Sequence, residues 1–104
     1  TLVNCQHVVV ENLVVQGFQL DGVNVHDNVF GARLLEITSR GNGRSGVSVG
    51  GASRVQIEAC LLGNNGAAQL RTEGHSVTTL KNNDLIDTNP LAPAVVSDGG
   101  KIIR

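Results

Sequence analysis

Five residues in two short stretches of this 104-residue chain are candidates for a chemical site. Asn24, His26 and Asp27 lie in the first stretch, and Arg71 and Glu73 lie in the second. Histidines and carboxylates can act as general bases near neutral pH, and a guanidinium can bind a carboxylate through two hydrogen bonds. If the fold brings the two stretches together, they form a site for an anionic ligand. A simpler interpretation also stays open, because polar side chains face outward from most folds only to be solvated.

The remaining histidines and the cysteines indicate no further site. His7 and His75 stand alone beside predicted turns, so we expect them to be surface residues. Cys5 and Cys60 belong neither to a Cys-x-x-Cys motif nor to a cluster with zinc spacing. We therefore predict no metal site at any of these residues.

The composition favours strands and turns over helices. The chain has 15 valines, 11 leucines and 5 isoleucines, but two phenylalanines and no tyrosine or tryptophan. Thirteen glycines and ten asparagines supply residues that form turns. Eight Lys and Arg balance nine Asp and Glu, so no long-range field selects nucleic acid or an anionic membrane. The longest apolar runs are far shorter than the roughly 20 residues that cross a bilayer, so we predict no transmembrane helix.

The elements that must position the five candidate residues recur every 23 or 24 residues. Sliding the sequence against itself aligns six columns in which 20 of 24 positions are apolar, about twice the number expected from the 40% hydrophobic content. Such an excess is typical of a repeat that stacks on itself. The columns are Val10, Leu34, Ile57 and Leu80; Leu13, Ile37, Cys60 and Asn83; Val15, Ser39, Leu62 and Leu85; Val8, Ala32, Val55 and Thr78; Val23, Val47, Leu70 and Ala94; and Val25, Val49, Thr72 and Val96.

Within each repeat, short strands alternate with corners. Apolar residues alternate with polar ones at residues 23–25, 47–49 and 55–57, which is the period-two pattern of a strand with one buried face. Between the strands, one column holds residues that tolerate left-handed backbone conformations. Its members are Gly17, Gly41, Asn64 and Asp87. The connections are too short for a crossover helix, so the sequence predicts an all-β chain of stacked strands.

Two folds repeat at this length, a leucine-rich-repeat horseshoe and a coil that stacks strand on strand. The horseshoe needs L-x-x-L-x-L-x-x-N in every repeat, and that motif does not recur. The V-x-V strands and Asn/Gly corners instead resemble the right-handed parallel β-helix superfamily of pectate lyases, polygalacturonases, alginate epimerases and phage tailspikes. The resemblance implies a right-handed parallel β-helix of about four and a half coils of 23–24 residues. It also implies amide ladders, for which Asn64 and Asn65, or Asn82 and Asn83, are candidates.

We expect residues 1–104 to form one β-helix module and to be a segment of a longer chain, because the repeat runs throughout without a linker. Uncapped coils expose open strand edges, so end-to-end self-association is also expected. Cys5 and Cys60 would lie two coils apart, about 10 Å, so we predict that they are not bonded. The predicted outward columns are Asn24, Ser48, Arg71 and Val95; His26, Gly50, Glu73 and Ser97; and Asp27, Gly51, Gly74 and Asp98.

One segment resembles part of the active coils of polygalacturonases. Asp21-Gly22 stands where that family has the Asp-Gly of N-T-D-G-x-D, but Asn24 replaces the second Asp. One coil later the family has G-D-D-C, whose paired carboxylates activate water and protonate the leaving group. The chain has Arg44 and Ser45 there, and neither acts as an acid or base near neutral pH without a partner. The G-H-G motif of polygalacturonases and the D-P-H-[ED] motif of alginate epimerases are also absent, so hydrolysis of pectic polysaccharides is not expected.

Two functions stay open on these observations. One is a non-catalytic β-helix scaffold segment of a secreted or surface carbohydrate-associated protein, either structural or sugar-binding. The alternative is part of a polysaccharide lyase, epimerase or glycoside hydrolase acting on acidic polysaccharides, so whether the chain is an enzyme is undecided. The resemblance implies that the outer face of Asn24, His26, Asp27, Arg71 and Glu73 binds sugars, with Arg71 holding a sugar carboxylate. It also implies an extracellular or cell-surface location and leaves Ca²⁺ as the one cofactor to consider, while no nucleic-acid or membrane partner is expected.

Overall fold

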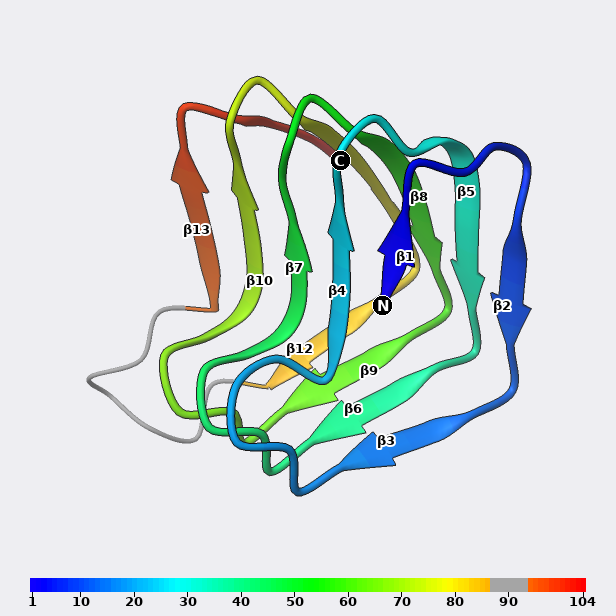
Figure 1. Ribbon diagram of the computed structural model, residues 1–104. Coiled ribbons are helices and arrows are strands. Elements are labelled where there is room, and N and C mark those ends of the chain that lie inside the picture. Colours follow the sequence, from blue (N-terminus) through cyan, green and yellow to red (C-terminus); the bar gives the residue numbers. More distant parts are fainter. Residues whose placement is uncertain (87–93) are drawn as a thin grey trace.

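Short strands separated by tight corners wind into a parallel β-solenoid of about four coils, which the computed structural model describes for residues 1–86 and 94–104 (Figure 1). Each coil of about 23 residues contributes one strand to each of three sheets, and strands of successive coils pair in parallel. Sheet A contains β1 (Leu2–Val3), β4 (Val23–His26), β7 (Ser45–Val49), β10 (Ala68–Glu73) and β13 (Val95–Asp98). Sheet B contains β2 (Val9–Glu11), β5 (Phe30–Leu35), β8 (Arg54–Glu58), β11 (Val77–Lys81) and β14 (Lys101–Ile103). Sheet C contains β3 (Val14–Gln16), β6 (Thr38–Arg40), β9 (Leu61–Gly63) and β12 (Asp84–Ile86). The predicted all-β solenoid and its repeat length are confirmed.

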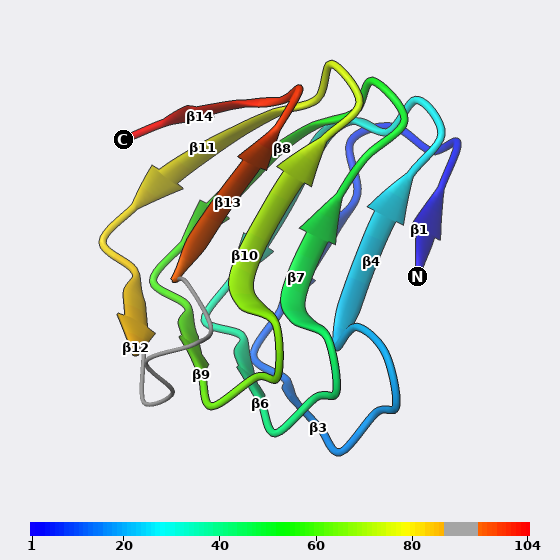
Figure 2. The same cartoon turned by 90° about the vertical axis from the view of Figure 1, so that its left-hand side faces the viewer.

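The predicted stacking register is confirmed for the first three coils. Val23 pairs with Val47, and Val47 pairs with Leu70, as Figure 2 lets the reader follow along β4, β7 and β10. Inward side chains of all three sheets form one core, because a single coil is too thin to bury its own apolar face. The fully buried aliphatic side chains at its centre are Val25, Val29, Leu34, Val47, Val49, Ile57, Leu62 and Leu70.

The last coil departs from the predicted register by one residue. Leu70 pairs with Val95, and not with Ala94 as predicted, so every later pairing in β13 shifts as well. A shift of one residue exchanges the two faces of a strand. Val95 and Ser97, which were predicted to face outward, therefore pair with the inward residues Leu70 and Thr72, although Ser97 is itself exposed. The prediction failed because residues 94–96 are three consecutive apolar residues, and such a run carries no alternation from which to choose a register.

Residues with left-handed backbone conformations occur at the corners. The sequence predicted them at one of the three corners, the one between sheets C and A. Between sheets C and A, Gly17, Gly41 and Asn64 have φ angles of 74°, 64° and 59°. Asp87, the fourth predicted member of this column, lies outside the described residues. A backbone in this region turns the chain sharply, which lets the next strand begin on a different sheet.

The corner between sheets B and C was not predicted. One residue per coil has a positive φ angle there, and these residues are Asn12, Glu36, Ala59 and Asn82. Glu36 and Ala59 are poor residues for this conformation, which costs a side chain with a Cβ roughly 1–2 kcal/mol. Backbone hydrogen bonds to the next coil hold them there, since Glu36 N–H donates to Glu58 O (3.1 Å) and Ala59 N–H donates to Lys81 O (3.0 Å).

Each corner also stacks inward side chains that accept hydrogen bonds from the backbone of the preceding coil; we call these stacks corner ladders. Between sheets A and B, Val29 N–H donates to Ser53 Oγ (3.1 Å), and Ser53 N–H donates to Ser76 Oγ (3.0 Å). These amides are buried, and an unpaired buried N–H costs about 1–3 kcal/mol. The ladder therefore fixes a small hydroxyl at each step of this corner.

The ladder between sheets B and C uses different atoms for the same purpose. Ile37 N–H donates to Cys60 Sγ (3.4 Å), and Cys60 N–H donates to Asn83 Oδ1 (2.8 Å). Asn83 also donates from Nδ2 to Ile57 O (2.8 Å). Cys60 is thus both a buried apolar residue, as predicted, and an acceptor in this ladder.

Asparagines form the ladder between sheets C and A. Phe18 N–H donates to Asn42 Oδ1 (3.1 Å), while Asn42 donates from N–H and Nδ2 to Asn65 Oδ1 (3.0 and 2.9 Å). Asn65 in turn donates to Gln69 Oε1 from N–H and Nδ2 (3.3 and 2.7 Å). Two of the asparagines predicted to form amide ladders do so: Asn65 stacks with Asn42 here, and Asn83 takes part in the ladder between sheets B and C.

Inward and outward positions should differ sharply in their tolerance of charge. Ile57 is fully buried between coils, whereas its neighbour Gln56 faces outward. We expect Ile57→Asp to lower the free energy of unfolding by about 3–5 kcal/mol, because it buries an unpaired carboxylate, and Gln56→Asp to cost under about 1 kcal/mol. Chemical denaturation of both variants measures this difference, and equal losses would contradict the assignment of the two faces.

The two thiols should be free and should differ in reactivity. Cys5 and Cys60 form no disulfide, as predicted, and burial raises the pKa of the Cys60 thiol. Since the thiolate is the reactive form, Cys60 should react with a thiol reagent at pH 8 far more slowly than the half-buried Cys5. After unfolding in denaturant, both should react at the same rate. Equal rates in the native protein, or fewer than two reactive thiols in the unfolded protein, would contradict the coil assignment.

Candidate functional site

The outer face of sheet A carries all five candidate residues, but in two groups. Asn24 and His26 lie on β4 with Asp27 just beyond it, and Arg71 and Glu73 lie on β10. Strand β7 separates the groups (Figure 2), so they are two strand spacings apart, about 10 Å. The shared face was predicted from the columns. No hydrogen bond or ion pair between the two groups is observed among the described residues.

Arg71 is held by two carboxylates on the β10–β13 side of this face. Its Nε donates to Glu73 Oε2 (3.1 Å) and its Nη2 donates to Asp98 Oδ2 (3.3 Å). Glu73 leans over Gly50 of the preceding coil, where an added Cβ would lie 3.3 Å from Glu73 Cγ. The three charged groups sum to a negative charge, so a ligand carboxylate must compete with Glu73 and Asp98 to reach the guanidinium.

Sequence reasoning missed Asp98 as the partner of Arg71. The predicted register placed Asp98 in the column of Asp27, whereas β13 pairs it with Glu73. Two acids in the same outer row of neighbouring coils require a cation between them, because like charges on adjacent strands repel. Arg71 meets this requirement, with its side chain 34% exposed. Aligning residues 71–73 with residues 96–98 would have revealed the pairing.

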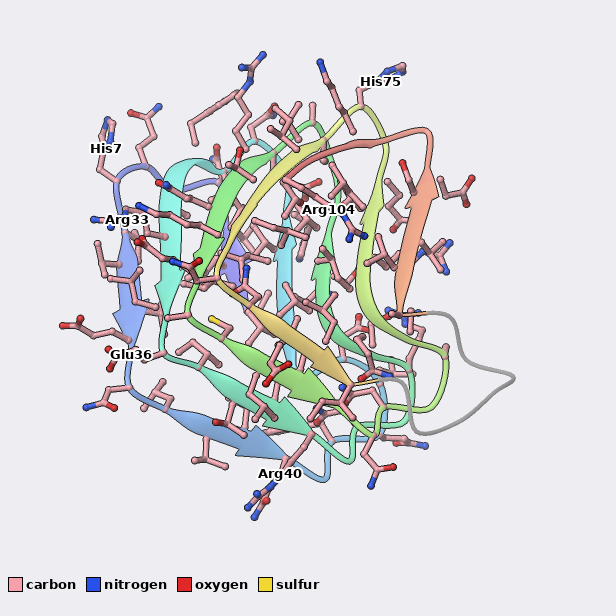
Figure 3. The ribbon with its side chains drawn as sticks, turned by 180° about the vertical axis from the view of Figure 1, so that it is seen from behind. His7, Arg33, Glu36, Arg40, His75 and Arg104 are labelled. Carbon is pink, nitrogen blue, oxygen red and sulfur yellow. The ribbon has the colours of Figure 1, made fainter. Side chains whose placement is uncertain are left out.

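Among the described residues, the side-chain hydrogen bonds and ion pairs observed for the β4 group lie within its own coil. His26 Nδ1 lies 3.2 Å from Asp27 Oδ2, and both side chains are well exposed. Asn24 donates from Nδ2 to Asp21 Oδ2 (3.4 Å). His7 and His75 are exposed and project away from the molecule at the corners between sheets A and B (Figure 3), so their predicted surface position is confirmed.

Asp21, singled out for its resemblance to a catalytic coil, is instead the centre of a clamp between two coils. Its side chain is only 2% exposed and accepts hydrogen bonds from Arg44 Nε (3.0 Å) and Nη2 (2.6 Å). Ser45 N–H donates to the same carboxylate (3.1 Å). The hydrogen bond to Asp21 raises the pKa of Arg44 above its already high ordinary value and so favours the charged guanidinium. Arg44, which stands where polygalacturonases have their paired carboxylates, is therefore the hydrogen-bonding partner of Asp21.

The outer face of sheet B carries a similar chain of charges. Glu58 receives Arg33 Nη2 at 3.1 Å from one coil, and Lys81 Nζ lies 3.7 Å away in the next. Arg33, Glu58 and Lys81 therefore pair along the solenoid axis, as Asp21 with Arg44 and Arg71 with Asp98 do on sheet A. Pairs of this kind join successive coils, although side chains such as Lys81 stay well exposed.

The described residues show neither a metal site nor a membrane-spanning helix. In residues 1–86 and 94–104, no three His, Cys, Asp or Glu side chains gather closely enough to hold a metal ion. Within the same ranges, no helix has the length and hydropathy needed to cross a bilayer. Comparison with protein-family models, curated proteins and solved structures finds no match for this chain.

The clamp of Asp21 and Arg44 should contribute measurably to stability. An amide at position 21 cannot accept bonds from both ends of the guanidinium, so we expect Asp21→Asn to lower the free energy of unfolding by about 1–2 kcal/mol. Asp27→Asn is the matched control, because Asp27 is exposed and Asn tolerates its positive φ angle; it should change stability by less than about 0.5 kcal/mol. Urea denaturation of the two variants measures both values. Equal effects would show that the clamp does not join the coils.

Proposed function

We propose that this chain is a non-catalytic β-solenoid scaffold segment of a secreted or surface carbohydrate-associated protein. The observation that carries the proposal is the pairing of outward charges across coils, as in Arg44 with Asp21 and Arg71 with Asp98. In each pair the arginine donates a hydrogen bond to a carboxylate of the neighbouring coil. Together with the corner ladders, these pairs join the coils into a stack whose faces repeat at the strand spacing.

The arrangement on sheet A is a poor one for acid–base catalysis. A lyase or epimerase needs a base placed beside the cation that holds the substrate carboxylate. On sheet A the cation would be Arg71 and the base would be Glu73, but Glu73 already accepts a hydrogen bond from Arg71. His26 lies two strands away and contacts Asp27. This geometry supports a scaffold over the enzymatic alternative.

The carbohydrate association and the extracellular location rest on the resemblance of the repeat to parallel β-helix proteins. That resemblance is one of architecture, and function depends on the site rather than on the fold. The proposal therefore keeps the class of ligand broad, as acidic polysaccharides, and assigns no reaction.

The isolated chain should not turn over acidic polysaccharides. Incubation with polygalacturonate and with alginate, each with and without Ca²⁺, should release neither reducing ends nor unsaturated products above a protein-free control. Turnover that Glu73→Gln or His26→Ala abolishes would overturn the proposal and establish a lyase-like enzyme on sheet A. Glu58→Gln, which removes a carboxylate from sheet B, is the matched control for those variants.

A further inference from the structure

Sheet B has a groove of about 480 Å³ on its outer face, away from the five candidate residues. It crosses β5, β8, β11 and β14 and runs between two outward rows of side chains. One row is Phe30, Arg54, Val77 and Lys101, and the other is Arg33, Gln56, Thr79 and Ile103. Figure 3 shows this side of the molecule, with Arg33 on β5. Crossing four strands gives a length of about 14 Å, so the groove suits a short stretch of a polymer.

A β-bulge lies at one end of the groove. The pairing of β5 with β8 skips Gly31, which is the extra residue between Phe30 and Ala32. Gly31 has a φ angle of 68° and lines the groove, and an added Cβ would lie 2.8 Å from His7 Nδ1. Bulges bend a strand and redirect its side chains. Here the ring of His7 occupies the place that a side chain of residue 31 would take, at the edge of the groove.

The outer face of sheet B is more basic than the chain as a whole. Its strands present four cationic side chains, which are Arg33, Arg54, Lys81 and Lys101. They present two carboxylates, Glu11 and Glu58. Glu58 is shared by Arg33 and Lys81, and Arg54 and Lys101 form no ion pair within the described part of the chain. The net charge of −1 thus conceals a face with an excess of positive charge.

The polar and apolar groups of the groove are arranged for a sugar chain with acidic groups. Arg54 can bind a carboxylate or sulfate, and the Gln56 amide and Thr79 hydroxyl can bond to hydroxyl groups. Val77 and Ile103 supply apolar contact for the C–H face of a sugar ring. The inner strands of sheet B are paired on both sides, so an extended peptide cannot add to them as a further strand. Recognition must therefore use side chains alone.

We propose that the groove on sheet B, centred on Arg54, binds acidic oligosaccharides. The proposal rests on the carbohydrate association proposed above, but it places the ligand on a different sheet from the five candidate residues. The two are separable, because a scaffold without turnover remains one whether or not this groove binds a sugar.

The test is calorimetric titration of the full chain with an oligogalacturonate of defined length. Arg54→Gln should weaken binding about five- to tenfold, since it removes one charged hydrogen-bonding pair at an exposed site. Gln56→Glu, which has nearly the same shape, should weaken binding at least as much because it places a carboxylate between Arg54 and Arg33. A structural effect would not produce this loss, since the added carboxylate has two cations beside it and the melting temperature should not fall.

Three controls make the assignment specific. Arg40→Gln removes the same charge from sheet C, where Arg40 projects away from the groove and binds Gln16 (Figure 3), and should leave Kd within about twofold. A neutral galacto-oligosaccharide of the same length should not bind. Oligoglutamate of matched charge should bind more weakly than the acidic sugar, because it lacks the contact between a sugar ring and Ile103. The variant Ile103→Ser removes that same contact from the protein side.

Several outcomes would overturn the proposal. These are no detectable binding by the unmodified chain, equal losses from Arg54→Gln and Arg40→Gln, and oligoglutamate binding as tightly as oligogalacturonate. A loss caused by Arg71→Gln but not by Arg54→Gln would move the site to sheet A and would also refute the groove. Turnover of the oligosaccharide during titration would instead refute the scaffold function, and product analysis of the same samples distinguishes that result.

Discussion

The stacking of coils depends on how the amides at the corners are satisfied. Where the chain passes from one sheet to the next, the buried N–H groups of Val29, Ile37 and Asn42 have no strand carbonyl to bond to, and a side chain from the following coil accepts each bond instead. A buried amide without a partner is costly, so each coil requires the next one to supply its acceptor. This requirement explains why Ser53, Cys60 and the asparagines occupy inward positions in an otherwise aliphatic core.

The same axial direction governs the surface. Asp21 with Arg44 and Arg71 with Asp98 join neighbouring coils from outside, as the ladders join them from inside. Because the spacing between coils is that of adjacent strands, a charge in one coil has its counterpart within reach only if the register is correct. Surface charge and core packing therefore select the same alignment, and agreement between levels of this kind specifies a single fold.

Recognition by such a structure must use rows of side chains. Inner strands of each sheet have both edges paired, so their backbones offer nothing to a ligand. The faces differ in which outward side chains already form ion pairs with one another. On sheet A, Arg71 is bound by two carboxylates, whereas on sheet B Arg54 lines a groove and has no carboxylate partner in the described chain. We therefore propose the groove on sheet B as a candidate for ligand binding besides the face predicted on sheet A.

The sequence by itself determined the repeat, because alternating apolar residues at a spacing of 23 or 24 can bury their faces only by stacking, and it placed the five candidate residues on one outer face for the same reason. It could not determine the register of the last coil, since the apolar run at residues 94–96 fits two alignments. Nor could it predict the left-handed Glu36, the partner of Asp21, or the groove beside Arg54. Those features depend on side chains from neighbouring coils acting on one another across the stack, and only the tertiary structure brings these side chains within bonding distance.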